Sequence, residues 1–508
     1  MDVLPPVAPG GLPLIGHAAR LTRDRLGFLE ELRALGPAVR IRLGRQQVLV
    51  LNDHRPIREL LTRRAGDFGL SPHFRVMKRI IGNGLLATDG PFHRRQRRIM
   101  MPVLAQSRMP HHARTMTALT ERRLARWRPG QELDLDREFT HLATETVVRC
   151  LFGADVTERE LDSVVDALPG LMAWAGTHGM DPTGLLCRLP TPLNRRFRRG
   201  MSDLTRLVAS LVSRRLACPG PGTATGTRTG TAAASQWPYE GDLLTALLEA
   251  RDPESGAPLA YQQVHDEIMT FLIAAVESVS RTLAWTVHRL SADPEVREAL
   301  HREVDDRLAG RCATAEDLPH LPLTRRILTE VLRLYPPGYL ISRTARRDTR
   351  LGIRLDGRLD GERSDHRIAV PAGTMVMFSY YALQRDPRLF PEPEEFRPDR
   401  WAGTPEGPPC DAYLPFGLGA HGCLGESFAW TEMAIVLASI AARWELRALT
   451  PVPPEPVPAF SLTLTDTRVT VRARSRPVES TPDTPDAPPT ASPAPSPSPT
   501  LTTAQKAV

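Results

Sequence analysis

The sequence predicts a mainly α-helical fold with small peripheral β-sheets. Helical periodicity recurs through most of the chain, as after residue 423, where apolar residues follow at spacings of three and one. Alternating, β-branched segments are confined to three places. They are residues 39–51 (VRIRLGRQQVLVL), a stretch from Ile341 to Phe378 that contains Gly and Pro, and residues 462–474 (LTLTDTRVTVRAR).

The domain organisation follows from composition. No linker divides residues 14–474, so we expect residues 1–474 to form a single domain. Residues 218–235 are rich in Gly, Thr and Ala and predict a flexible surface connection inside that domain. Residues 475–508 are dominated by Pro, Ser, Thr and Ala, and we expect this tail to be disordered because it has little apolar surface to bury.

Charge and cysteine usage exclude several classes of protein. The 508 residues carry a formal net charge of +7, but only Lys78 and Lys506 among 65 basic residues are lysine, and no nucleic-acid-binding motif is present. The six cysteines are scattered, as in a reducing compartment. The N-terminal prolines and the lack of a long apolar run argue against a signal peptide or a membrane anchor. We therefore predict a cytoplasmic protein that binds no nucleic acid.

The loop FGLGAHGCLGES, residues 416–427, places Cys423 among four glycines. A helix follows, with a predicted apolar stripe of Met433, Val436, Leu437, Ile440, Ala441 and Trp444. Permissive backbone and the positive end of a helix dipole both favour a thiolate. The loop alone leaves open whether the cysteine is a metal ligand, a nucleophile or an incidental thiol in a turn.

Three other segments carry polar residues at suggestive spacings. In RRILTEVLRLYPP, Glu330 and Arg333 share a helical face, although such a pair is usually an exposed salt bridge. In FLIAAVESVSRTLAW, Glu277 and Ser278 interrupt a buried run, either as a proton relay or as a capping or solvent-facing pair. The basic run GPFHRRQRR, residues 90–98, suits anion binding or a solvated helix face.

Together these segments resemble the cytochrome P450 family. The loop matches the family's haem-binding signature, and the four motifs occur in the family's order between about Pro5 and Arg474. The resemblance implies the cytochrome P450 fold and a haem b whose iron is ligated by the Cys423 thiolate, with backbone amides protecting the sulfur. The residues at the signature positions are Phe416, Gly417, Gly419, His421, Cys423 and Gly425.

The resemblance also implies roles for the other motifs. Phe416 would cover the sulfur, and Glu277 and Ser278 would deliver protons. Ala275, Ser278 and Val279 depart from the family's usual glycine, threonine and second hydroxyl. The residues expected to bind the haem propionates are His93, Arg97, Arg343 and His421, and those expected to form a structural network beneath the haem are Glu330, Arg333 and Arg400.

The function implied is that of a monomeric haem-thiolate monooxygenase acting on a hydrophobic molecule, terpenoid-like or fatty-acid-like, with O2. No flavin or dinucleotide domain is visible, so electrons would come from a ferredoxin and its reductase. Arg94, Arg95 and Arg98 would face this acidic redox partner. The alternatives are a haem-binding sensor or carrier without turnover, and a hydrolase with Cys423 as nucleophile and His421 as a poorly placed base.

Overall fold

Every predicted motif lies within one structural unit, Met1–Ala473. The predicted flexible connection at 218–235 and the predicted tail at 475–508 lie outside the residues that the structure describes. The computed structural model describes residues 2–71, 74–179, 186–217, 242–251, 256–353, 366–403, 411–450 and 454–474.

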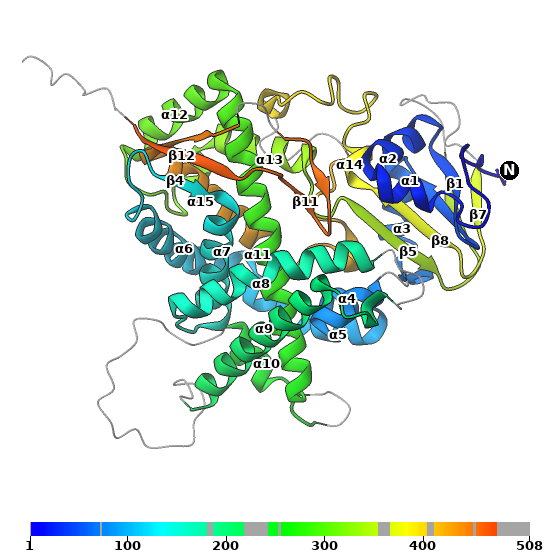
Figure 1. Cartoon of the computed structure of the whole chain (residues 1–508), viewed down its shortest axis with the longest axis horizontal. Helices are drawn as coiled ribbons and strands as arrows, with labels where there is room; N and C mark the ends of the chain where they lie inside the picture. Colours follow the sequence, from blue (N-terminus) through cyan, green and yellow to red (C-terminus); the bar gives the residue numbers. More distant parts are fainter. Residues whose placement is uncertain are drawn as a thin grey trace, which may run out of the picture. The chain divides into compact units, whose positions relative to one another are not determined.

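A five-stranded sheet lies at the N-terminal end of this unit (Figure 1). Its order is β1-β2-β8-β5-β3, with β2 and β8 parallel and the other pairs antiparallel. The first predicted strand segment and the two ends of the second, β5 and β8, therefore lie in one sheet although they are far apart in sequence. The strands are β1 (Ala38–Leu43), β2 (Gln46–Leu51), β3 (Phe68–Leu70), β5 (Leu340–Ala345) and β8 (Met375–Ser379).

Alternation along β2 explains how this sheet is covered on both faces. Val48 and Val50 pack with apolar residues of α1 (Ala18–Arg23) and α2 (Arg25–Ala34). Leu49 and Leu51 point to the other face and pack with α3 (His54–Leu61). Burial of successive side chains on opposite faces makes the sheet a rigid support for β5, which carries Arg343.

Three smaller sheets complete the β structure. The predicted strand at the C-terminal end is divided between a hairpin and a three-stranded sheet of order β4-β12-β9. The strands are β4 (Glu132–Asp134), β6 (Thr349–Gly352), β7 (Arg367–Val370), β9 (Trp444–Ala448), β10 (Val457–Pro458), β11 (Leu462–Thr463) and β12 (Arg468–Ala473).

The helical part of the unit is built around α11 (Tyr261–Ala292), which runs through its middle (Figure 1). This helix is long and apolar enough to cross a membrane. However, 83% of its apolar 18-residue stretch is buried inside the protein, as in a core helix. Its neighbours include α7, α9, α13 and α15. The other helices are α4 (Phe74–Ile81), α5 (Gly90–Met100), α6 (Met109–Leu124), α7 (Leu135–Phe152), α8 (Glu158–His178), α9 (Pro192–Ala217), α10 (Leu243–Glu249), α12 (Pro294–Leu308), α13 (Pro322–Leu334), α14 (Tyr380–Leu383) and α15 (Glu426–Arg443), with 3-10 turns at Ala65–Asp67, Leu85–Ala87, Met101–Leu104, Gln106–Arg108, Leu186–Arg188, Leu318–His320, Pro398–Trp401 and Gly419–His421.

Most of the helix boundaries follow from local sequence. Helix α13 ends at Leu334, just before Pro336 and Pro337, as a proline pair requires. The apolar stripe predicted for α15 is buried from Met433 to Ala441. The prediction was wrong for Trp444, which begins β9 because its backbone pairs with Ala473 of β12.

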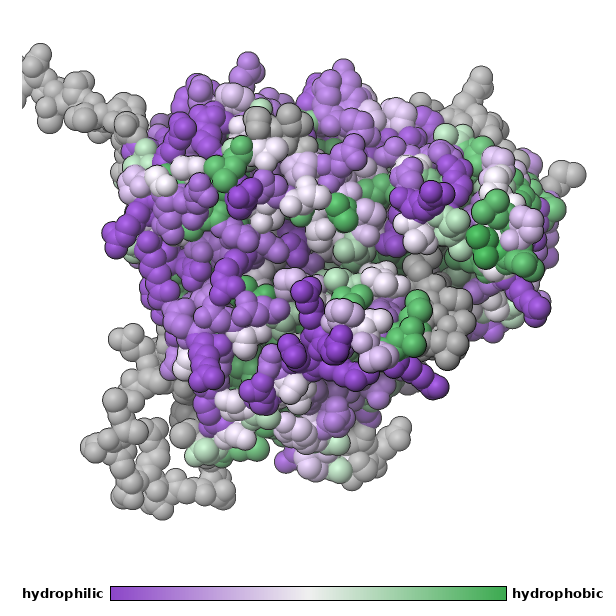
Figure 2. Space-filling model, viewed as in Figure 1, coloured by the Kyte–Doolittle hydropathy of each residue, from purple (hydrophilic) through white to green (hydrophobic). Residues whose placement is uncertain are grey.

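The face of the molecule in Figure 2 is mostly hydrophilic, with apolar residues gathered near the sheet at the N-terminal end. Exposed apolar side chains of the N-terminal segment include those of Leu4, Val7 and Leu14. Several carboxyls are buried in the core, and that of Glu432 on α15 has Thr146 of α7 as its polar neighbour. Burial raises the pKa of Glu432 to about 8.

Glu432 makes stability depend on pH. The folded protein keeps this proton up to about pH 8, whereas the unfolded chain loses it above 4.5, so stability falls as pH rises through that window. Glu432→Gln cannot lose this proton, so we expect its free energy of unfolding to fall less as pH rises, by on the order of 1 kcal/mol or more. Urea denaturation at several pH values measures the difference. Glu298→Gln, at an exposed carboxylate on α12, is the matched control. An unchanged pH dependence in Glu432→Gln would contradict the assignment.

Candidate active site

The Cys423 loop joins the 3-10 turn Gly419–His421 to the start of α15. The backbone N–H of Cys423 donates to the carbonyl oxygen of Phe416 at 2.7 Å, which closes the loop. The backbone N–H of Gly425 donates to the thiol. The ring of Phe416 lies 5.9 Å from that of Trp430. The sulfur is therefore held at a helix start with one backbone donor directed at it.

Two glycines of this loop are required by the backbone. Gly417 and Gly419 have φ values of 68° and 69°, in the left-handed region. A Cβ on Gly419 would also overlap the carbonyl oxygen of Leu61 at the end of α3. At Gly425 the protein leaves the space for a Cβ open. The explanation that glycines let amides approach the sulfur thus applies to Gly425, whereas the other two shape the turn.

The thiol of Cys423 is not activated by the protein alone. The residue is accessible, yet protein atoms surround the sulfur on most sides, and this burial raises its pKa to about 11 despite the Gly425 N–H and Arg97. Burial, Arg343 and His93 lower the pKa of His421 to about 3. A protonated thiol beside so weak a base makes a poor nucleophile, which argues against the hydrolase alternative. A metal ion, in contrast, would stabilise the thiolate.

Four basic side chains gather beside this loop from three elements. The rings of His93 on α5 and His421 lie 4.2 Å apart. Arg97 Nη1 donates to the carbonyl oxygen of Gly422 at 2.8 Å, adjacent to Cys423. Arg343 on β5 is buried and donates to the carbonyl oxygen of Ser342 at 2.9 Å. The structure thus brings together all four residues expected to bind the propionates.

The electrostatics of this basic group suit an anion. Burial and the charge of Arg97 lower the pKa of His93, and burial lowers the pKa of Arg343. The neighbouring carboxylate of Asp89 already pairs with Arg346 and accepts the Leu70 N–H. Since these buried groups repel one another, two carboxylates bound here would stabilise their charged forms. The residues present therefore fit the propionates of a haem whose iron meets Cys423.

Helix α11 presents an accessible face in an otherwise buried helix. Ala274, Ala275 and Ser278 remain accessible, at spacings that place them on one face. The hydroxyl of Ser278 donates to the carbonyl oxygen of Ala275 at 3.3 Å. Helix α11 also packs against α15, whose first residues follow Cys423. The small side chains of this face leave room for a flat cofactor and a substrate.

The side chain of Glu277 diverges from that of Ser278. Glu277 is 4% exposed and its Oε1 accepts hydrogen bonds from Arg281 Nε at 3.2 Å and from the Ser461 hydroxyl at 2.6 Å. Arg281 is also paired with Asp136 of α7. The alternative of a solvent-facing pair is therefore wrong for Glu277. No local pattern indicates the partners of Glu277 and Arg281, because Asp136 and Ser461 are distant in the chain.

The carboxylate of Glu330 is the centre of a buried network that joins α13 to residues 397–401. Glu330 and Arg333 both have fully buried side chains and form two hydrogen bonds of 2.9 Å. Arg400 Nε and Trp401 Nε1 donate to the same carboxylate at 2.8 and 2.9 Å. Burial alone would raise the pKa of Glu330, but the hydrogen bonds and charge of Arg333 hold it below its usual value. The exposed salt bridge considered as an alternative is therefore wrong.

Local sequence patterns indicate only part of this network. Glu330 and Arg333 are one helical turn apart, but nothing local indicates that the indole of Trp401 or the backbone N–H of Arg397 would donate to Glu330. Each oxygen of the carboxylate accepts more than one donor, so the buried charge is well compensated.

A cysteine at a helix start, a buried basic group beside it and a small-residue face on a core helix together define a haem-thiolate protein. The cytochrome P450 family pattern matches residues 5–471. Cyclooctatin synthase of Streptomyces melanosporofaciens is 35% identical over 467 residues, covering 91% of this chain and 94% of that protein. Cyclooctat-9-en-7-ol 5-monooxygenase of the same organism is 36% identical, covering 88% and 90%. Pentalenene oxygenase of Streptomyces avermitilis is 33% identical, covering 86% and 90%.

The chain belongs to the cytochrome P450 family. It is a monooxygenase, an oxidoreductase that incorporates oxygen, and the family binds haem b with its iron. The predictions of fold, enzyme class and cofactor are thereby confirmed. The roles of the individual side chains stay predictions, and the contacts of each side chain indicate which substitution would test its role.

Removal of the Glu330 carboxylate should destabilise the protein strongly. Glu330→Ala leaves Arg333 buried without its carboxylate, which we expect to cost roughly 3–5 kcal/mol, measured by urea denaturation of the haem-loaded protein. Glu394→Ala is the matched control, since this mostly exposed carboxylate also pairs with a buried arginine, Arg385, at 3.0 Å. Its cost should stay below about 1 kcal/mol. Equal effects of the two substitutions would contradict a structural role for Glu330.

Proposed function

We propose that this monooxygenase oxidises a terpenoid, with Cys423 as the haem-iron ligand. The observation that carries the proposal is the similarity, over at least 86% of the chain, to relatives named for cyclooctat-9-en-7-ol and pentalenene. The apolar side chains of Leu70, Phe74 and Phe92 in the pocket between α4 and α5 agree with a hydrophobic substrate. The relatives favour the terpenoid over the fatty acid that the sequence left open.

Bound haem b would supply the iron at which O2 is activated. The Cys423 thiolate would hold that iron, and the N–H of Gly425 would stabilise the negative charge on the sulfur. Arg97 would act twice, because it touches the Cys423 loop and lies beside the propionate site. His93, His421 and Arg343 would bind the propionates and thereby orient the ring.

Ser278 is the residue we assign to proton delivery at the accessible face of α11. Its hydroxyl can donate outward when it leaves the Ala275 carbonyl oxygen, a bond that is already long at 3.3 Å. Glu277 would act from behind this face, through its contacts with Ser461 and Arg281. The hydroxyl would thus hold a proton at the accessible face of α11, while the Glu277 carboxylate points away from it.

Electrons would come from a ferredoxin and its reductase. Arg94 and Arg98 are exposed one turn apart on α5, and Arg95 packs over the Phe92 ring at 5.1 Å. The same helix carries Arg97, so a partner docked there would lie close to the iron ligand. Acidic groups on the partner would complement this basic surface. The monomeric state and the cytoplasmic location stay predictions.

Iron ligation and substrate class can be tested together. The reduced protein with carbon monoxide should show the strongly red-shifted Soret band of thiolate ligation, and Cys423→Ser should lose it. Cyclooctat-9-en-7-ol should shift the ferric wild type from low to high spin and be oxidised with added redox partners. Absence of the red-shifted band would refute the ligand assignment. An intact band without a spin shift or product from terpenoids would refute the substrate class.

Ser278→Ala should reduce the amount of product formed per reduced nicotinamide consumed by about tenfold or more, because the proton donor is lost. Ser278→Thr, which keeps the hydroxyl, should retain coupling. Ser280→Ala is the matched control, since this buried hydroxyl points to the Glu277 carbonyl oxygen at 3.3 Å. The product and hydrogen peroxide yields measure the effect. Equal coupling in Ser278→Ala and the wild type would show that this hydroxyl is not needed.

A further inference from the structure

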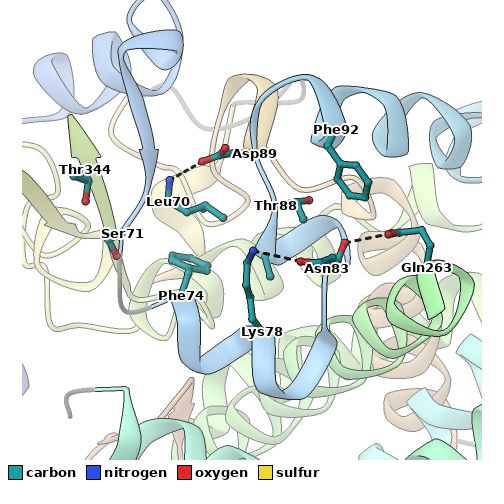
Figure 3. A pocket seen from close by; sticks show the side chains of 11 residues that line it. Leu70, Ser71, Phe74, Lys78, Asn83, Thr88, Asp89, Phe92, Gln263 and Thr344 are labelled. Carbon is teal, nitrogen blue, oxygen red and sulfur yellow. Dashed lines mark hydrogen bonds between the residues drawn. The ribbon is translucent and has the colours of Figure 1, made fainter. Parts of the chain in front are cut away.

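A pocket of about 850 Å3 lies between α4, α5 and α11 (Figure 3). Leu70, Phe74, Ala87 and Phe92 form an apolar wall, and the other lining residues are polar: Ser71, Lys78, Asn83, Thr88, Asp89, Gln263 and Thr344. Lys78 is exposed and is the only cationic side chain among the lining residues that the structure describes, and the carboxylate of Asp89 is already paired with Arg346. An apolar wall beside an exposed ammonium group suits a ligand with an apolar body and one polar end.

The wall of this pocket is a turn, residues 82–85, that is fastened to α11 by two carboxyl groups. Asp266 Oδ2 accepts the backbone N–H of Asn83 at 2.7 Å, and Glu267 Oε2 accepts the backbone N–H of Leu85 at 2.8 Å. Both carboxyl groups belong to buried residues. The Asp266 bond is charge-assisted, because hydrogen bonds from His265 and Asn83 hold the pKa of Asp266 below its usual value despite burial. Burial raises the pKa of Glu267 to about 8, so its carboxyl accepts the Leu85 N–H in the neutral form at neutral pH. Two bonds to consecutive parts of one turn fix its backbone against the helix.

The glycines of the turn make this close approach possible. Gly82 has a φ of 55°, in the left-handed region, and a Cβ there would overlap the carboxylate of Asp266. A Cβ on Gly84 would overlap the hydroxyl oxygen of Thr270. The sequence GNG is therefore shaped for contact with α11, and it leaves the Asn83 side chain as the polar group that the turn presents.

Fixing the turn places Asn83 opposite Lys78. Lys78 Nζ donates to Asn83 Oδ1 at 3.3 Å, and Gln263 Nε2 donates to the Asn83 carbonyl oxygen at 3.3 Å (Figure 3). Gln263 also donates to Glu267 Oε1 at 2.8 Å, which links this end of the pocket to the carboxyl group that holds the turn. The pocket thus presents a cationic donor and a neutral acceptor side by side.

The same face of α11 leads from this turn toward the accessible face at Ser278. Glu267, Thr270, Ala274 and Ser278 follow at spacings of three and four, so they share one side of the helix. Glu267 and Ala274 are two turns apart, about 10 Å along the axis. A terpenoid whose polar end lies near Lys78 could therefore extend along α11 toward Ala274.

We propose that Lys78 and Asn83 bind the hydroxyl end of a hydroxylated terpenoid substrate. A hydroxyl is both donor and acceptor, so it can accept from Lys78 Nζ and donate to Asn83 Oδ1, whereas a carboxylate would meet the amide oxygen unfavourably. Asp266 and Glu267 are positioning residues, because they act through the turn. This inference rests on the proposed terpenoid oxidation and narrows it to substrates that already carry an alcohol.

The test compares cyclooctat-9-en-7-ol with the same ring hydrocarbon lacking the hydroxyl, by titrating the spin shift of the ferric haem-loaded protein. The wild type should bind the alcohol about tenfold more tightly, and Lys78→Met should lose this preference while keeping the affinity for the hydrocarbon. Arg79→Met removes a cation from the same helix outside the pocket lining and should keep the preference.

The outcomes separate the two proposals. Equal affinity of the wild type for both ligands would overturn the role of Lys78 and leave terpenoid oxidation standing. A preference that survives in Lys78→Met, or is lost equally in Arg79→Met, would also overturn it. If neither ligand shifts the spin state although the carbon monoxide band is intact, the terpenoid substrate is wrong, and the role of Lys78 falls with it.

The role of Glu267 can be measured by the preference for the alcohol over the hydrocarbon, a quantity that a purely structural role would leave unchanged. Glu267→Ala should lose the preference for the alcohol with an unchanged carbon monoxide band, because Asn83 is no longer held. Glu267→Gln keeps an oxygen that can accept the Leu85 N–H, and we expect it to restore the preference. If Glu267→Ala keeps the full preference, or if Glu267→Gln fails to restore it, the turn is not held in the way we infer.

Discussion

The position of the Cys423 loop depends on the hydrogen bonds that the buried carboxylate of Glu330 accepts. Glu330 holds Arg333, and Arg333 Nη1 donates to the carbonyl oxygen of Gln384 at 2.9 Å. Gln384 Oε1 in turn accepts the backbone N–H of Leu414 at 3.0 Å, where the approach to the loop begins. Leu414 then accepts the N–H of Gly417 at 3.0 Å. A chain of short hydrogen bonds thus runs from one carboxylate to the loop that carries Cys423.

Charges are treated in two opposite ways in this protein. Glu330 and Glu277 have their cationic partners inside the protein, so their burial is compensated by the fold itself. Arg343 and His421 lie together with little negative charge nearby, and burial depresses their pKa values. The first arrangement stabilises the fold, and the second is the site that we propose for the haem propionates. We therefore expect haem binding to be coupled to folding through electrostatics.

Helix α11 connects the separate parts of the site. Asp266 and Glu267 hold the turn at residues 82–85, and Ala274 and Ser278 are accessible further along the side of the helix that carries Glu267. Glu277 points in another direction and meets Arg281 and Ser461. The residues that we propose for substrate placement and for proton delivery therefore share one rigid support, and we expect a shift of this helix to affect both.

Local periodicity determined much of this structure in advance. The alternation in residues 46–51, the prolines after α13 and the glycines around Cys423 encode backbone conformation, which depends on near neighbours. The spacing of Glu330 and Arg333 likewise placed both on one face. Only the tertiary structure decided that Trp444 leaves its helix, that Glu277 points away from Ser278, and that Asp266 meets Asn83, 183 residues away in the sequence. The partner of a buried polar group is set by whichever distant backbone packs against it, and no local pattern records that choice.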